Sequence, residues 1–156
     1  MTDKNMVPEA EILNADECWK LLEHTSVGRL GVVVDGEPDV FPVSFKVDGE
    51  GLVFRTGSGT KLQAIEANSM VALEADSVSA EFGLAWSVVV KGKAVQDDGA
   101  GPALNEPRRG LFPWQGVGQD HLIRIVPQSV TGRRFTLSAT GTWQTPLNEA
   151  TRAGLE

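Results

Sequence analysis

The chain has 156 residues, of which 41% are hydrophobic and 22% are charged, and its formal charge at pH 7 is −7. This length fits one domain with a sizeable core, and the acidic balance argues against a general nucleic-acid binder, which would present a basic face. A single cysteine, Cys18, excludes an internal disulfide and a cysteine-rich zinc site. Without a long apolar run or a signal-like N-terminus, the sequence predicts a cytoplasmic protein that binds no membrane.

The N-terminal part of the chain predicts a flexible segment followed by a helix. Residues 1–10 are polar and are expected to be loose. Asn14 and Glu17 have the spacing of a capping box, so we expect a helix to begin directly after Asn14. Cys18 and Leu22 then fall on one face at helical spacing. A lone cysteine on such a face is expected in the core rather than as a nucleophile.

The rest of the chain is dominated by alternating apolar runs between turn signals. Asp35-Gly36 is a strong two-residue hairpin signal. Pro42 cannot donate to a ladder, so it should lie at an edge or bulge, and Gly92 marks a bend in the longest strand. Hairpin-linked strands with few helices indicate an antiparallel barrel. The expected strands are 28–34, 39–47, 52–56, 70–76, 84–95 and 121–127, with 129–135 as a continuation.

The most informative stretch, Phe54-Arg55-Thr56-Gly57-Ser58-Gly59-Thr60-Lys61, joins a strand to a short expected helix, Thr60 to about Asn68. A helix N-terminus offers unpaired N–H donors and partial positive charge, which favour a phosphate. Arg55 adds planar two-point recognition and Lys61 a mobile charge. The alternative is a polar loop in which Thr60 merely caps the helix. The spacing matches neither the P-loop nor the dinucleotide fingerprint. The hydroxyls of the stretch belong to Thr56, Ser58 and Thr60.

Side chains suited to catalysis are scarce. The two histidines, His24 and His121, do not lie at metal-ligand spacing, and His121 on a strand is expected to be structural or a ligand contact. Glu74 and Asp76 point to one side of a strand, where we expect them to be solvated. Chemistry is therefore expected to reside in a bound cofactor. A phosphate site beside apolar strands and Trp86 suits an aromatic phosphorylated ligand.

These features resemble the pyridoxamine 5′-phosphate oxidase-like family, the FMN-binding split barrels. The likeness spans residues 12–135; each motif is weak alone, but the ordered set is fairly specific. The residues that carry it are Glu17-Cys18-Trp19-Lys20-Leu21-Leu22, Val27-Gly28-Arg29-Leu30, Phe41-Pro42-Val43-Ser44-Phe45, the 54–61 stretch, Trp86-Ser87-Val88-Val89-Val90-Lys91-Gly92 and Val130-Thr131-Gly132-Arg133-Arg134.

The resemblance implies a mainly β fold, a six-stranded antiparallel split barrel with a few short flanking helices, over residues 11–137, followed by a polar tail at 138–156. It also implies a homodimer with FMN at the subunit interface. In such a protein the phosphate and the flavin ring are held by different segments. The phosphate stretch corresponds here to Arg55, Thr56, Ser58, Thr60 and Lys61, the ring strand to Pro42, Val43 and Ser44, and a further segment, from the same chain or its partner, to Trp86 and Ser87.

The implied activity is the passage of hydride or electrons between FMN and a small organic substrate. Two alternatives remain: a reductase that uses the deazaflavin F420, and a flavin- or haem-binding module without turnover. F420 carries a long acidic tail, for which Arg108 and Arg109 are candidate contacts in a long loop at 97–119 that also contains Trp114. The chain has no histidine near its end, unlike true pyridoxamine phosphate oxidases, so the resemblance does not imply vitamin B6 phosphates as substrates.

Overall fold

A computed structural model describes residues 10–97 and 121–136 of the chain. The expectations for the N-terminal segment before residue 10, for Arg108, Arg109 and Trp114, and for the tail at 138–156 lie outside the described residues. The elements of the described ranges are β1 (Ala10–Leu13), α1 (Ala15–Glu23), β2 (Val27–Val34), β3 (Glu37–Asp48), β4 (Gly51–Thr56), α2 (Thr60–Ala67), β5 (Met70–Ser79), β6 (Leu84–Asp97) and β7 (His121–Thr136).

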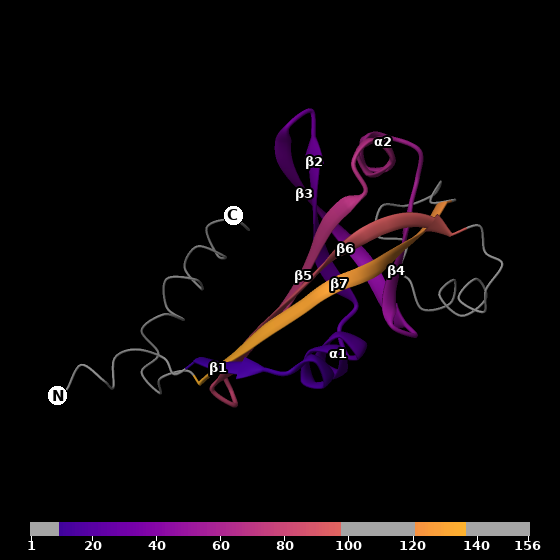
Figure 1. The fold of residues 1–156 in the computed structure, drawn as a ribbon. Helices are drawn as coiled ribbons and strands as arrows, with labels where there is room; N and C mark the ends of the chain where they lie inside the picture. Colours follow the sequence, from indigo (N-terminus) through magenta and orange to yellow (C-terminus); the bar gives the residue numbers. More distant parts are fainter. Residues whose placement is uncertain (1–9, 98–120, 137–156) are drawn as a thin grey trace.

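The strands form one antiparallel sheet that closes on itself. Their order is β1-β7-β4-β3-β2-β5-β6, and β7 also pairs with β6, which completes the ring. The predicted mainly β antiparallel barrel is therefore confirmed (Figure 1). The short strand β1 was not predicted, because three of its four residues are exposed and show no apolar alternation.

Three local predictions about the strands are confirmed. Asp35 and Gly36 both have left-handed φ angles, 52° and 79°, as the predicted β2–β3 hairpin turn requires. Pro42 pairs with Arg29 of β2, while the pairing of β3 with β4 begins only at Phe45, so Pro42 lies where β3 is paired on one side. The ladder between β6 and β7 shifts register next to Gly92, where a Cβ would collide with the backbone carbonyl of Val126.

The core fills the ring, and the two helices lie at opposite ends of the sheet (Figure 1). α1 buries Cys18 and Leu22, and α2 buries Leu62, Ala64 and Ile65. Cys18 is fully buried and burial raises the pKa of its thiol, which confirms its expected place in the core. Neither helix in the described ranges has the length and apolar run that a membrane crossing needs.

Candidate functional site

The N-terminus of α2 is left open by the sequence that precedes it. Gly59 is the N-cap residue, and its carbonyl accepts the Gln63 amide at 2.9 Å, but no side chain of the described residues caps the helix. The alternative that Thr60 caps the helix is therefore wrong: Thr60 is already the first helical residue. The first turn has no acid and instead contains Lys61. Since the first amides of any helix lack intrahelical partners, this end favours an anion.

Lys61 connects this helix end to β3. The residue is only 7% exposed, which is rare for a lysine, and burial lowers the pKa of its ammonium. Its Nζ lies 5.4 Å from the centroid of the Phe41 ring, within the range of a cation–π contact. Phe41 directly precedes Pro42, so a buried cation lies next to the segment expected to hold the flavin ring.

Ser44 and Arg55 bring the two predicted segments together from neighbouring strands. Phe45 pairs with Phe54, and Ser44 and Arg55 are the next residues beyond that pair. The Phe45 amide donates to Ser26 on the β2 side at 3.0 Å, so the alternating Ser44 amide points away from β2. Ser44 is 7% exposed, and among the described residues its Oγ has no hydrogen-bond partner. A buried hydroxyl of this kind costs about 1–3 kcal/mol, which a polar ligand would offset.

The three hydroxyls of the loop differ in their surroundings. Thr56 is buried, and its Oγ1 donates to the Gly57 carbonyl at 3.2 Å, whereas Thr60 is exposed. Ser58 is exposed and lies 3.2 Å from Nε2 of His121, whose Nδ1 lies 2.8 Å from Nε2 of Gln96. The contact through Gln96 was missed, because no local signal in the sequence places the end of β6 beside this loop.

Trp86 and Ser87 lie elsewhere in the chain. His121 pairs with Thr56 at one end of β7, and Trp86 pairs with Arg134 near the other end. The 13 residue steps from His121 to Arg134 correspond to roughly 40 Å along a strand. Within one chain, Trp86 and Ser87 are therefore not brought to the loop at 55–61.

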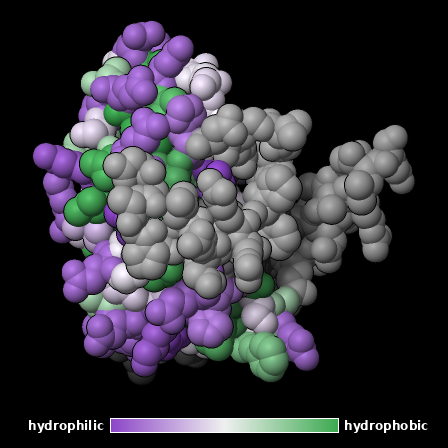
Figure 2. All heavy atoms as spheres, turned by 90° about the vertical axis from the view of Figure 1, so that its right-hand side faces the viewer, coloured by the Kyte–Doolittle hydropathy of each residue, from purple (hydrophilic) through white to green (hydrophobic). Residues whose placement is uncertain are grey.

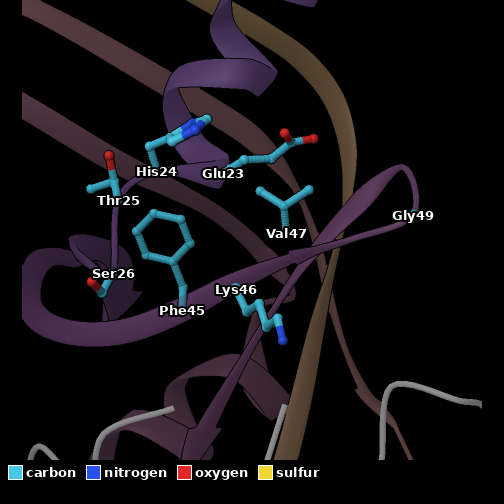
Figure 3. A pocket seen from close by; sticks show the side chains of 8 residues that line it. All are labelled: Glu23, His24, Thr25, Ser26, Phe45, Lys46, Val47 and Gly49. Carbon is cyan, nitrogen blue, oxygen red and sulfur yellow. The ribbon is translucent and has the colours of Figure 1, made fainter. Parts of the chain in front are cut away.

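Two hollows of about 490 Å³ each flank the connection from α1 to β2. One opens between the end of α1 and β3, where Phe45 and Val47 point toward the helix and Lys46 points the other way (Figure 3). The other includes Val27 of β2, which pairs with Ser44, and Trp86 of β6. Both have the size of a small-molecule site, but residues 55–61 line neither of them.

A cluster of charges on β2 and β5 borders the second hollow. Nη1 of Arg29 lies 3.3 Å from Oε1 of Glu74 and 3.2 Å from Oδ2 of Asp76. Burial raises the pKa of Glu74 to about 7, aided by the hydrogen bond and charge of Asp76 and opposed by Arg29. Glu74 is partly buried and paired with Arg29, whereas Asp76 is exposed, so the expectation of a solvated acid pair fits Asp76 better than Glu74. Among the described residues no group of three or more His, Cys, Asp or Glu side chains could hold a metal ion.

Comparison with known proteins confirms the family resemblance. The sequence profile of pyridoxamine 5′-phosphate oxidase matches residues 14–134. An FAD-binding protein from Mycobacterium smegmatis is 40% identical, with a TM-score of 0.64 over 80% of this chain and 99% of that one. An FAD-binding protein from Mesorhizobium loti is 25% identical, with a TM-score of 0.70 over 83% and 98%. A haem-binding protein from Mycobacterium smegmatis, 17% identical with a TM-score of 0.60 over 76% and 53%, shares the fold alone.

Proposed function

Because the chain belongs to the pyridoxamine 5′-phosphate oxidase family, we propose that it binds a flavin and passes hydride or electrons between that flavin and a small organic substrate. The observation that carries the proposal is the buried Lys61 at the uncapped start of α2, whose Nζ lies 5.4 Å from the centroid of the Phe41 ring beside Pro42. A buried cation and open helix amides together suit a phosphate. We expect this activity in the cytoplasm, a compartment that fits a chain with one free thiol.

The residues of the site divide the work of holding such a ligand. Arg55 and Lys61 would neutralise the phosphate, assisted by hydroxyls of the loop and the first amides of α2. Pro42, Val43 and Ser44 would line the ring, and the unsatisfied Ser44 Oγ supports a polar ligand edge at that place. A bound flavin supplies the redox chemistry, which these side chains do not.

We propose FMN as the cofactor. The two FAD-binding relatives support a flavin in general, and FAD contains the same 5′-phosphate that the loop would bind. F420 remains an alternative cofactor on this fold. A binding module without turnover, for flavin or haem, remains the alternative in another functional class, and the fold of the haem-binding neighbour is compatible with it.

We also propose that two copies of the chain form the complete site. Val33, Val40 and Met70 form an outer apolar patch on β2, β3 and β5 that is 39%, 62% and 41% exposed. Hydrophobic atoms also reach the surface among hydrophilic ones in the described part of the face in Figure 2. Contiguous apolar surface is typical of association sites. In such a homodimer Trp86 and Ser87 would reach the cofactor from the partner subunit.

The first test is a titration of the purified, cofactor-free protein with FMN, FAD, F420 and haem, each followed by absorbance and fluorescence. Saturable FMN or FAD binding with a perturbed flavin band would support the proposal. Anaerobic addition of NADH or NADPH to the complex then separates an oxidoreductase, whose flavin is bleached, from a module whose flavin stays oxidised.

The remaining outcomes point away from the proposal. Binding of F420 alone would assign the protein to the deazaflavin reductases, and binding of haem alone would favour the module. If none of the four ligands binds, the flavin proposal is wrong. Size-exclusion chromatography with light scattering tests the homodimer, with a monomer at every concentration as the contradicting result.

A further inference from the structure

Two consecutive side-chain hydrogen bonds connect the loop at 55–61 to the strands of the barrel, and no sequence motif predicts them. The residues that form these bonds come from three elements: Ser58 from the loop after β4, His121 from the start of β7 and Gln96 from the end of β6. The pairing of His121 with Thr56 fixes the imidazole beside the loop. These two hydrogen bonds therefore connect the ends of three strands to one hydroxyl of the proposed phosphate site.

The side-chain amide of Gln96 determines which atom donates and which accepts in each of these hydrogen bonds. Nε2 of Gln96 carries two hydrogens and donates, so Nδ1 of His121, 2.8 Å away, must accept. A neutral imidazole that accepts at Nδ1 carries its hydrogen on Nε2. That hydrogen is donated to Oγ of Ser58 at 3.2 Å. Ser58 then has its own O–H hydrogen left to donate elsewhere.

We infer that Gln96 and His121 are positioning residues that hold Ser58 as a hydrogen-bond donor to the phosphate of the bound cofactor. This inference rests on the proposed function, because it assumes that the loop binds a phosphate. A phosphate has only acceptor oxygens when ionised, so a serine that accepts from His121 and donates to the ligand matches it. In the reverse direction Ser58 would donate its only hydroxyl hydrogen to His121 and would have none left for the phosphate.

The second histidine of the chain provides an internal reference. Nδ1 of His24 lies 2.8 Å from the carbonyl oxygen of Lys20, which can only accept, so His24 carries its hydrogen on Nδ1. The two histidines are therefore expected to be opposite tautomers. Nitrogen-15 NMR of the labelled protein, at a pH well above the ordinary imidazole pKa of about 6.5, reads both tautomers, and a His24→Gln variant assigns the signals.

The matching perturbation is Gln96→Glu, because a carboxylate only accepts hydrogen bonds. At a pH where the imidazole is neutral, this places the hydrogen of His121 on Nδ1, so Nε2 accepts and the Ser58 hydroxyl turns to donate to it. We expect FMN affinity to fall roughly tenfold to a hundredfold, as for the loss of one hydrogen bond to a charged group. Gln63→Glu, which adds the same charge on the exposed side of α2, should change the affinity much less.

A double-mutant cycle of Gln96→Glu with Ser58→Ala shows whether Gln96 acts through Ser58 or whether the new carboxylate simply repels the phosphate. In a Ser58→Ala background Gln96 and His121 have no hydroxyl to orient, so Gln96→Glu should have little further effect on FMN affinity. An Nδ1–H tautomer of His121, unchanged affinity in Gln96→Glu, or an equal loss in the Ser58→Ala background would each overturn the inference alone. If the wild-type protein binds neither FMN nor FAD, the proposed function fails and the inference fails with it.

Discussion

The two helices of the barrel begin in opposite ways: in the part of the chain that the structure describes, the first turn of α1 is capped, and that of α2 is not. In α1, the Asn14 side chain accepts from the Glu17 amide at 2.9 Å, and the Glu17 carboxylate accepts from the Asn14 amide at 3.2 Å. Asp16 and Glu17 add negative charge to its first turn. In α2, the N-cap is Gly59, no side chain within residues 10–97 and 121–136 caps the helix, and the first turn contains Lys61 instead of an acid.

This difference shows how one chain separates stability from binding. The start of α1 satisfies its own amides and complements the helix dipole, as a structural helix should. The start of α2 omits both devices and adds a cation where an anion would stabilise the helix. A helix end that its own sequence leaves unfavourable is the place where a bound phosphate would contribute most.

The largest expected effect comes from removing the cations beside α2. Arg55→Ala and Lys61→Ala should each weaken FMN binding by roughly 1.5–3 kcal/mol, the value of a hydrogen bond to a charged group. Titration of FMN measures the affinity, and Lys61→Met tests whether packing against Phe41 contributes. Lys20→Ala on α1, which removes one exposed charge, is the matched control; unchanged affinity in both loop variants would contradict the phosphate assignment.

The capping box of α1 should contribute to stability and not to binding. Asn14→Ala is expected to lower the free energy of unfolding by about 1 kcal/mol, since the variant leaves an amide of the first turn unsatisfied. Urea unfolding measures this, with the exposed Gln63→Ala as a control for a helical surface position. FMN affinity should be the same in both variants. A clear loss of affinity in Asn14→Ala would mean that the two helix ends are coupled.

The buried Lys61 should give the cofactor-free protein a characteristic pH dependence. Its folded-state pKa lies below the ordinary value of a lysine in the unfolded chain, because burial disfavours the charged form. Between these two pKa values the unfolded chain binds more protons, so stability should rise with pH across that window. Urea unfolding from neutral to alkaline pH should show this rise in the wild type and not in Lys61→Met. If stability depends on pH in the same way in both proteins, burial does not lower the pKa of Lys61.

The smallest effect should come from giving α2 the cap that it lacks. At Gly59 a Cβ would meet no atom of the described residues within 4 Å, and φ of 161° is extended backbone that other residues adopt. Gly59→Asp should therefore stabilise the cofactor-free protein by a few tenths of a kcal/mol. It should also weaken FMN binding by repelling the phosphate, while Gly59→Asn adds the cap without the charge. Thermal unfolding and FMN titration check both; stronger binding by the aspartate variant would refute the anion site.

Local features of this protein could be predicted from the sequence, and long-range ones could not. The capping box at Asn14, the turn at Asp35-Gly36 and the register shift at Gly92 depend on a few neighbouring residues. The Lys61–Phe41 contact depends on β3 lying beside the start of α2, and the raised pKa of Glu74 depends on burial between strands. The strand β1 exists because residues far along the chain pair with it.

The position of β7 in the chain has a consequence for how the protein is made. β7 pairs with β1, β4 and β6, and Ala10 faces Phe135 across the first of these ladders. During synthesis, β4 and β6 therefore wait with one edge unpaired until residue 136 has left the ribosome. Ladders between such distant segments form slowly, and open edges are where nascent chains associate wrongly. The ring thus closes late, and the interval before closure is when the nascent chain most needs protection by chaperones.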